Sequence, residues 1–320
     1  MGHGKLHKFA ENETFRCLLQ PDASSVRAKP EGSKELILRD HAIKGRWNED
    51  MFAKPQPIVV ELGCGKGDYT IALARRHPEM NFIGVDIKGA RLWKGAKEAT
   101  EEAMGNVAFL RTRIEFIDAF FGPGEVSEIW LTFSDPQLRG SENARLTSPL
   151  FLQRYSRFLK PGGIVHLKTD SRFLYEYTQS VIRANNLPVL ASGVDIYHDG
   201  FRTGVTLENR RCATPPTASG GPLPLMRPRV ATGFQESPLP EEDEWDMDAV
   251  FEVQTFYESM FLKMSLPITY LAFRLDRAGL APGASFAYPT DFDAAYWREA
   301  EGPRRSFSHQ PTKGVSNGSL

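Results

Sequence analysis

The sequence is poor in cysteine, in long apolar runs and in net charge. Its three cysteines, Cys17, Cys64 and Cys212, are widely separated in a chain of 320 residues. Their spacing matches neither a disulfide framework nor a zinc site, so we expect free thiols and no bound metal. No apolar run reaches the roughly 20 residues that a membrane-spanning helix needs. The polar first residues do not resemble a signal peptide. These features predict a soluble, cytoplasmic protein without a membrane partner.

The formal net charge of −1 gives no sign of a nucleic-acid-binding protein, which is more often basic overall. The charges are unevenly distributed, however. Residues 241–248, Glu-Glu-Asp-Glu-Trp-Asp-Met-Asp, contain six acids. Basic residues lie in the other segments, among them Lys5, Lys8, Arg139, Arg145, Arg154, Arg157 and Lys160. The chain outside the acidic run is therefore positive.

From residue 57 onward, apolar segments typical of strands alternate with amphipathic segments typical of helices. This alternation predicts parallel strands joined by helical crossovers, that is, an α/β doubly wound sheet. Ser148 followed by Pro149 is a typical helix start, and Asp170 or Ser171 is expected to cap a later helix. We predict strands at 57–62, 81–86, 106–112, 127–133, 163–169, 189–196 and 268–275, and helices at 67–77, 89–104, 148–159 and 171–185.

The composition divides the chain into regions. Residues 1–56 form a partly basic N-terminal extension, and residues 57–276 form the main domain. Residues 203–247 interrupt this domain, and the seven prolines between 214 and 240 predict a disordered insertion there. The segment 277–320 is a low-complexity tail rich in glycine, proline and serine, which we expect to pack loosely or not at all.

Residues 58–74 predict a buried strand, a glycine turn and a helix. Gly63, Gly65 and Gly67 occupy every second position, so the backbone can turn sharply and a ligand can approach it without meeting a Cβ atom. The helix that follows points its N-terminus toward such a ligand. The pattern is typical of a nucleotide-binding site, although a tight turn without a ligand would also explain it.

The acids around this turn favour S-adenosylmethionine over NAD. A dinucleotide site has a third glycine three residues after the second, which packs the helix against the strand below a pyrophosphate, whereas this chain has Asp68 there. Glu61, at the end of the strand, would repel a diphosphate but suits a ligand with an amino group and a sulfonium. We therefore assign Glu61, Gly63 and Gly65 to an S-adenosylmethionine site.

Ligands of a doubly wound sheet bind beyond the carboxyl ends of its strands, so the residues there are further candidates. Asp86 ends the second strand, 23 residues after Gly63, and can accept hydrogen bonds from ribose hydroxyls, although it could instead cap the next helix. Arg113 follows the third strand, where an adenine ring is expected, or is a plain surface residue. Asp135 ends the fourth strand, and Pro136 restricts its backbone near the cofactor's methyl group, although Asp-Pro is also a common turn.

Five further segments lie in a fixed order along the chain. They are Gly4-Lys5-Leu6-His7-Lys8-Phe9, Phe133-Ser134-Asp135-Pro136-Gln137-Leu138-Arg139, Asn143-Ala144-Arg145-Leu146, His166-Leu167-Lys168-Thr169-Asp170 and Thr255-Phe256-Tyr257-Glu258. In combination they resemble the bacterial tRNA (guanine-N7)-methyltransferases, and the resemblance extends from about Lys5 to Leu275, without the insertion. Ser134 and Gln137 stand where the family has proline and tryptophan, and Thr-x-x-Glu is also a common helix-capping sequence.

The resemblance implies a Rossmann-like class I S-adenosylmethionine-dependent methyltransferase whose sheet has an antiparallel last strand. It also implies methyl transfer to N7 of a guanine in the variable loop of tRNA, which forms 7-methylguanosine. Asp135 is then catalytic, and the cofactor is bound by Glu61, Gly63, Gly65, Asp86, Arg113 and Asp135. The guanine nucleotide is bound by Arg139, Asp170, Thr255, Phe256, Tyr257 and Glu258, and tRNA phosphates contact Lys5, Lys8, Arg139 and Arg145.

Three other functions remain open. An S-adenosylmethionine-dependent enzyme that acts on another substrate would have the same fold, because the fold alone does not determine the substrate. An NAD-dependent oxidoreductase is disfavoured by Asp68 and Glu61. A catalytically silent RNA-binding relative is suggested by Ser134 and Gln137, although all the acids expected at the cofactor are present. Both a monomer and a homodimer are compatible with the sequence.

Overall fold

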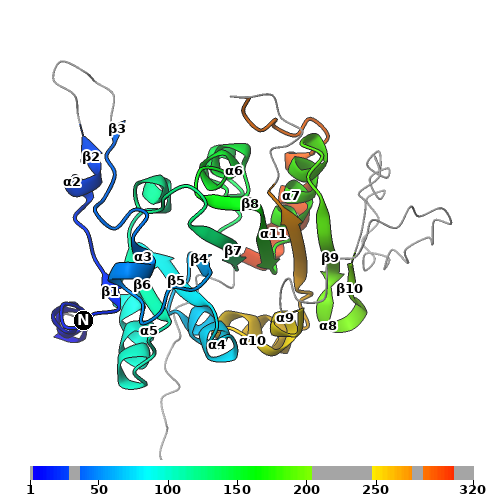
Figure 1. The fold of residues 1–320 in the computed structure, drawn as a ribbon. Helices are drawn as coiled ribbons and strands as arrows, with labels where there is room; N and C mark the ends of the chain where they lie inside the picture. The colour runs from blue at the N-terminus through cyan, green and yellow to red at the C-terminus, as the bar shows by residue number, and fades with distance from the viewer. Residues whose placement is uncertain (1–2, 29–36, 204–246, 276–283, 306–320) are drawn as a thin grey trace, which may run out of the picture.

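A computed structural model describes residues 3–28, 37–203, 247–275 and 284–305 of the protein. A nine-stranded sheet with the order β1-β6-β5-β4-β7-β8-β11-β9-β10 forms its centre (Figure 1). The strands of this sheet are β1 (Leu18–Leu19), β4 (Ile58–Leu62), β5 (Asn81–Asp86), β6 (Val107–Arg111), β7 (Val126–Thr132), β8 (Leu159–Thr169), β9 (Val189–Asp195), β10 (Gly200–Thr203) and β11 (Thr269–Arg274). A separate pair, β2 (Arg27–Ala28) and β3 (Ile37–Leu38), is antiparallel.

The strand directions confirm the predicted Rossmann-like sheet with an antiparallel last strand. β1, β6, β5, β4, β7 and β8 are parallel to their neighbours in this row. In the centre of the row, Val60 on β4 is level with Ile83 on β5 and Ile129 on β7. β11 runs antiparallel between β8 and β9. Parallel strands need crossover connections, which the helices between them supply.

Helices cover both faces of the sheet. Figure 1 shows α4, α5, α9 and α10 along one face and α6 and α7 along the other. The helices are α1 (His3–Asn12), α2 (Ala23–Val26), α3 (Trp47–Asp50), α4 (Asp68–Arg76), α5 (Gly89–Glu101), α6 (Pro149–Tyr155), α7 (Arg172–Ala184), α8 (Ile196–Asp199), α9 (Met247–Glu252), α10 (Phe256–Lys263) and α11 (Ala294–Arg305), with 3₁₀ turns η1 (Ile114–Ala119) and η2 (Glu142–Ala144).

One apolar core lies on each face of the sheet, between the strands and the helices, because successive side chains of a strand point to opposite faces. On β4, Val59 packs into the core below α4 and α5, and Val60 packs into the core below α6 and α7. β4 and β5 are buried along their whole length. Their near-continuous apolar sequences are what a sheet covered on both faces requires.

Most of the predicted elements agree with the structure to within a few residues. Ser148 caps α6 and Pro149 is its first residue, as predicted. α6 is shorter than predicted, however, and ends at Tyr155, because Leu159 already pairs with Val126 of β7 as the start of β8. The cap of α7 is Ser171, whose hydroxyl accepts a hydrogen bond from Leu174 N–H at 3.2 Å.

The prediction of a loosely packed tail is wrong for residues 284–305. α11 lies beside α7, and Phe286 is buried. The ring of Phe292 meets the rings of Phe173 and Tyr177 edge-on. Glu301 accepts a hydrogen bond from the backbone N–H of Phe173 at 3.1 Å. Tertiary contacts to α7 therefore order a segment whose local composition is typical of a loop.

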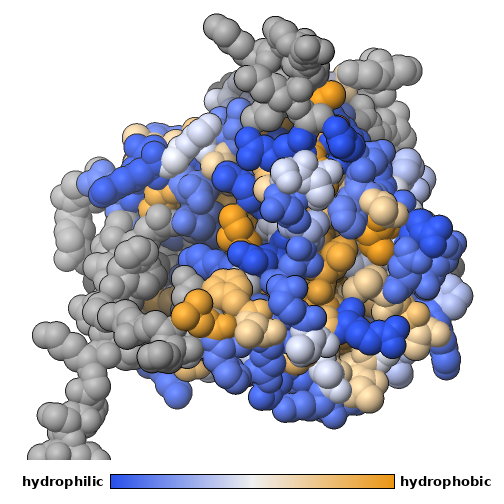
Figure 2. Space-filling model, turned by 90° about the vertical axis from the view of Figure 1, so that its left-hand side faces the viewer, coloured by the Kyte–Doolittle hydropathy of each residue, from blue (hydrophilic) through white to orange (hydrophobic). Residues whose placement is uncertain are grey.

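The N-terminal extension packs against α5 and adds β1 to the sheet. Trp93 on α5 donates its indole N–H to Glu11 on α1 at 2.7 Å. Figure 2 shows that the face of the molecule on this side is mostly hydrophilic, with separate small apolar patches. In the parts of the chain that the structure describes, each helix is too short or too polar to cross a bilayer.

Cys17 and Cys64 are free thiols. Cys212 and nearly all of the insertion predicted at 203–247 lie outside the described residues.

Candidate functional site

The glycine turn leaves β4 at its carboxyl end and leads into α4. Gly63, Gly65 and Gly67 have φ angles of 81°, 61° and 78°, in the left-handed region that favours glycine. The backbone N–H groups of Gly63 and Cys64 both donate to the carbonyl of Val85 on β5, at 2.8 and 3.0 Å. A Cβ atom added at Gly63 or Gly65 would meet nothing within 4 Å. The turn is therefore held against β5 and leaves room for a ligand at these two glycines.

Asp86 lies beside the glycine turn at the end of β5 and is only 7% exposed. One carboxylate oxygen accepts the backbone N–H of Gly65 at 3.1 Å, and the other accepts that of Lys88 at 2.7 Å. Each oxygen keeps a second lone pair, so Asp86 can still accept two ribose hydroxyls. Its bond to Lys88 fixes the turn ahead of α5, but the N-cap residue of this helix is Lys88, so Asp86 is not the helix cap.

Glu61 does not lie on the open side of the turn, where its expected contact with the cofactor would be made. Its side chain is 3% exposed, and burial raises its pKa. One oxygen accepts the backbone N–H and the hydroxyl of Thr70 on α4, at 2.9 and 2.5 Å. The other accepts the hydroxyl of Thr132 on β7 at 2.5 Å. Glu61 therefore joins β4, α4 and β7 below the turn.

The loop after β7 carries Asp135 at the surface. Phe133 and Gln137, on either side of it, both have φ of 50°, which residues other than glycine rarely adopt. A carboxylate oxygen of Asp135 accepts the backbone N–H of Gln137 at 2.9 Å. The hydroxyl oxygen of Ser134 is buried and has no hydrogen-bond partner within the described part of the chain. Unusual backbone geometry of this kind is concentrated at functional sites.

Arg139 and Arg145 differ in their access to a nucleic acid. Arg139 is exposed after the Asp135 loop, as a phosphate contact requires. Arg145 is 4% exposed, and its guanidinium lies 4.9 Å from the ring centre of Phe173 and 4.5 Å from that of Tyr177. The expected contact of Arg145 with tRNA phosphate is therefore wrong, because these rings and the surrounding core enclose it.

Three other basic residues were expected at the site. Arg113 is exposed beyond β6 and donates to Glu115 at 3.0 Å, and this ion pair raises the pKa of the guanidinium. The ammonium of Lys8 lies 4.3 Å from the ring centre of Trp93 and is half-buried. The side chain of Lys5 lies outside the described residues.

The Thr255–Glu258 segment begins α10. The hydroxyl of Thr255 accepts the backbone N–H of Glu258 at 3.1 Å, and the carboxylate of Glu258 accepts the backbone N–H of Thr255 at 3.3 Å, which is a complete capping box. Phe256 and Tyr257 are 56% and 50% exposed, whereas Glu258 is fully buried. The structure thus presents the two rings to solvent and buries the carboxylate of Glu258, which was expected to bind the guanine nucleotide.

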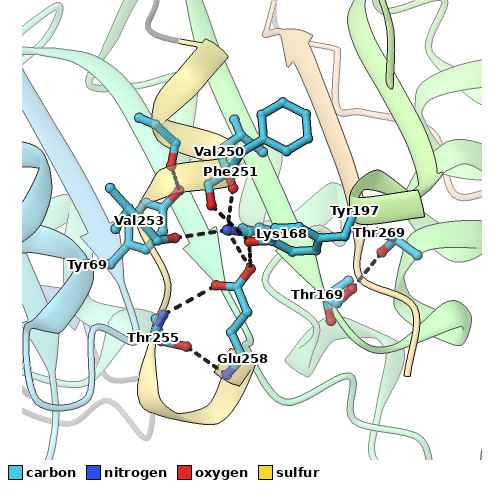
Figure 3. Close-up of polar contacts among 11 residues, drawn as sticks. Tyr69, Lys168, Thr169, Tyr197, Val250, Phe251, Val253, Thr255, Glu258 and Thr269 are labelled. Carbon is cyan, nitrogen blue, oxygen red and sulfur yellow. Dashed lines mark hydrogen bonds and ion pairs between the residues drawn. The ribbon is translucent and has the colours of Figure 1, made fainter. Parts of the chain in front are cut away.

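The partner of Glu258 is Lys168, a fully buried residue of β8 (Figure 3). Its ammonium lies 2.6 Å from a carboxylate oxygen of Glu258. The hydroxyl of Tyr197 donates to the same oxygen at 2.7 Å. Burial lowers the pKa of Lys168, and the adjacent carboxylate opposes this shift. Lys168 was not among the site residues predicted from the sequence, although a lysine inside an apolar strand is a signal of a buried partner.

Asp170 follows β8 directly and is partly exposed. Ser171 caps α7, so Asp170 is not the helix cap. The carbonyl of the preceding residue, Thr169, accepts the hydroxyl of Thr269 on β11 at 2.8 Å. These contacts fix the end of β8, where Asp170 begins the connection to α7.

The sheet brings several of these residues to one edge. β5, β4, β7 and β8 are parallel neighbours, so the loops at their carboxyl ends follow one another along the sheet. These loops carry, in spatial order, Asp86, the glycine turn, Asp135 with Arg139, and Asp170. Within the described residues, no cluster of histidine, cysteine and acidic side chains is arranged to hold a metal ion.

Comparison with known proteins finds relatives with one shared name. A family model described as "Putative methyltransferase" matches residues 55–199. A tRNA (guanine-N(7)-)-methyltransferase of Bacteroides thetaiotaomicron is 40% identical over 280 residues, which cover 88% of this chain and 89% of that protein. The protein of this name from Christiangramia forsetii is 40% identical and matches over 85% of this chain and 97% of its own length. The one from Porphyromonas gingivalis is 55% identical over 158 residues, or 49% of this chain and 64% of its own length.

Proposed function

The chain belongs to the tRNA (guanine-N7)-methyltransferase family, and we propose that it methylates N7 of a guanine in the variable loop of tRNA. The methyl donor is S-adenosylmethionine. The observation that supports this reaction most is the place of Asp135. Its strand, β7, lies between β4, which carries the glycine turn, and β8, which leads to Asp170. Candidate cofactor ligands and candidate substrate ligands thus flank one carboxylate. With tRNA as the proposed substrate, we also propose a cytoplasmic location.

The open glycine turn and Asp86 fit a nucleoside cofactor. Gly63 and Gly65 let the ligand approach the backbone, and Asp86 has unused lone pairs for the ribose hydroxyls. Arg113 lies beyond the adjacent strand, at the proposed adenine position. Glu61 holds the turn in shape from below, so its contribution to the methionyl end of the site is to position the loop.

The chemistry makes modest demands on the protein. S-adenosylmethionine supplies an electrophilic methyl group bonded to a sulfonium. Guanine N7 has a lone pair and no proton, so its attack requires no general base. What the chain contributes is alignment of N7 with the methyl carbon, which supplies several kcal/mol as effective molarity. The carboxylate of Asp135 stabilises the positive charge that develops on the guanine imidazole ring.

The proposed guanine site lies on the other side of Asp135. Asp170 accepts hydrogen bonds from guanine N1 and N2, Phe256 and Tyr257 offer exposed rings for stacking, and Arg139 pairs with a phosphate. Stacking on an aromatic ring is worth roughly 1–3 kcal/mol per base. Glu258 is buried and acts by holding the segment that carries the two rings.

The Asp135→Ala variant tests the catalytic assignment. We expect its methyl transfer to tRNA to fall about 100-fold or more, because the carboxylate no longer faces the developing charge. The rate is measured with labelled S-adenosylmethionine, and thermal unfolding confirms that the variant folds. Asp50→Ala is the matched control, since Asp50 pairs with exposed Arg46 ahead of β4, near the opposite end of the strands. Near-normal activity of Asp135→Ala would disprove its role.

A further inference from the structure

Lys168 uses its whole hydrogen-bonding capacity on one distant segment. An ammonium group has three protons. Its nitrogen lies 2.5 Å from the carbonyl oxygen of Val250, 3.0 Å from that of Val253 and 2.6 Å from a carboxylate oxygen of Glu258 (Figure 3). The three partners all belong to residues 250–258, which lie more than 80 positions further along the chain. A buried lysine on β8 thus holds the segment from α9 to α10.

These partners are the ends of two helices. The carbonyls of Val250 and Val253 lie at the carboxyl end of α9, where backbone oxygens lack partners inside the helix and attract a cation. Glu258 lies in the first turn of α10, where a carboxylate is favourable, and its other oxygen accepts the N–H of Thr255. Lys168 therefore neutralises the end of one helix and the start of the next at a single point.

Residues 255–257, which we call the corner, lie at the junction of the two helices and include residues expected to bind the substrate. Phe256 and Tyr257 point to solvent directly after Thr255. The ammonium of Lys66, in the glycine turn, lies 5.2 Å from the ring centre of Phe256. β8 ends at Thr169, one residue after Lys168, and Asp170 follows it directly. One lysine thus connects the strand that leads to Asp170 with the corner that carries the exposed rings.

We propose that Lys168 is a positioning residue for substrate: its ion pair with Glu258 sets the location of the 255–257 corner relative to Asp170, and so determines how well the guanine nucleotide of tRNA binds. This role rests on the proposed function. Lys168 acts through the corner and does not contact the substrate, because it is fully buried. Tyr197 assists, since its hydroxyl lies 2.7 Å from the same carboxylate oxygen.

The double variant Lys168→Met/Glu258→Gln is the main test. Removing both charges together avoids the large penalty of leaving one buried charge unpaired. The carbonyls of Val250 and Val253 still lose their donor, so the corner is released. We expect kcat/KM for tRNA to fall about tenfold or more, because small displacements of substrate-orienting groups are costly. The Kd for S-adenosylmethionine is expected to stay within about twofold, since the three polar partners of Lys168 lie at residues 250–258 and not in the glycine turn or at Asp86.

Hydrogen exchange supplies a readout that does not need activity. We expect amides of residues 253–260 to exchange about tenfold faster in the double variant, while those of β4 and β5 are unchanged. Tyr197→Phe is a milder second variant, which removes one hydroxyl and leaves the ion pair intact, and its effects on tRNA kcat/KM and on exchange are expected in the same direction. Lys97→Met is the control, because Lys97 pairs with Glu11 on the α1 side of the molecule.

The outcomes separate this inference from the proposed function. If the wild-type protein does not methylate tRNA, the proposed function fails, and with it the role of the corner in substrate binding. If the wild-type protein is active but the double variant keeps normal kcat/KM for tRNA and normal exchange at 253–260, Lys168 is not a positioning residue. A parallel loss of S-adenosylmethionine affinity would also contradict the proposal, because it would indicate a general structural role. Should the double variant not fold, Tyr197→Phe decides between the same outcomes.

Discussion

At the scale of single residues, the glycine turn shows how similar positions serve different purposes. Gly65 and Gly67 both have left-handed backbone angles. A Cβ atom at Gly65 would point into open space, whereas one at Gly67 would come within 2.6 Å of the ring of Phe109. Gly65 therefore leaves room for the cofactor, and Gly67 allows close packing of the turn against β6. The sequence alone shows three equivalent glycines.

This difference predicts that alanine at Gly67 mainly lowers stability, whereas alanine at Gly65 mainly weakens cofactor binding. Gly67→Ala combines backbone strain with overpacking and should reduce the free energy of unfolding by roughly 2–5 kcal/mol. Gly65→Ala should cost only about 1 kcal/mol of stability, from backbone strain. It should nevertheless weaken S-adenosylmethionine binding about tenfold or more, or roughly 1.4 kcal/mol.

Urea denaturation and calorimetric titration with S-adenosylmethionine measure the two effects separately. The same loss of stability in both variants, with unchanged cofactor affinity in Gly65→Ala, would contradict the assignment of an open cofactor side at Gly65.

At the scale of secondary-structure elements, α11 is the largest departure from the sequence prediction. Arg298 on α11 donates to the carbonyl of Leu138 in the Asp135 loop at 2.8 Å, and Glu301 accepts the N–H of Phe173 at the start of α7. α11 thus supports both the Asp135 loop and the helix that follows Asp170. The apolar anchors Phe286 and Phe292 lie ahead of α11 in the sequence, and they do not form a periodic pattern that would predict this packing.

The central sheet, in contrast, was predictable from the sequence. β4 and β5 are near-continuous apolar runs, the first followed by Gly63 and the second ended by Asp86, and those signals are local. The positions of Asp86 and Asp135 were predictable for a related reason, because parallel strands bring their carboxyl ends to one edge of the sheet. The burial of Glu61, Arg145 and Glu258 could not be predicted, since it depends on partners far away in the sequence. For Glu258 the decisive partner is Lys168, 90 positions earlier.

We expect Glu301→Ala to lower the free energy of unfolding by about 1–2 kcal/mol, because the N–H of Phe173 loses its acceptor in a buried position. Glu299→Ala on the same helix is the control, since Glu299 is exposed, and its effect should stay within about 0.5 kcal/mol. Equal stability of the two variants in urea would show that α11 does not support α7.

At the scale of the whole molecule, the near-neutral net charge does not tell which basic side chains are exposed to a nucleic acid. Of the basic residues expected to contact tRNA, Arg145 is buried and Lys8 is half-buried against Trp93, while Arg139 is exposed. We therefore expect binding of a polyanion to depend on exposed cations such as Arg139. Each such contact releases counterions and makes affinity depend on salt.

Arg139→Ala should therefore weaken tRNA binding and reduce the slope of log Kd against log salt concentration by about one, the value for one lost phosphate contact. Filter binding at several salt concentrations measures this slope. Arg46→Ala, an exposed arginine paired with Asp50, should leave the slope unchanged. An unchanged slope in Arg139→Ala would mean that Arg139 does not contact phosphate.

The most direct test of the central claim is to locate the transferred methyl group. The protein is incubated with unmodified tRNA and labelled S-adenosylmethionine, and the product is treated with reagents that cleave RNA at 7-methylguanosine. We predict incorporation of label and cleavage at a guanine in the variable loop, with both reduced about 100-fold or more in Asp135→Ala. Labelled tRNA that resists this cleavage would show that the methyl group is attached to another atom or base, and would contradict the account.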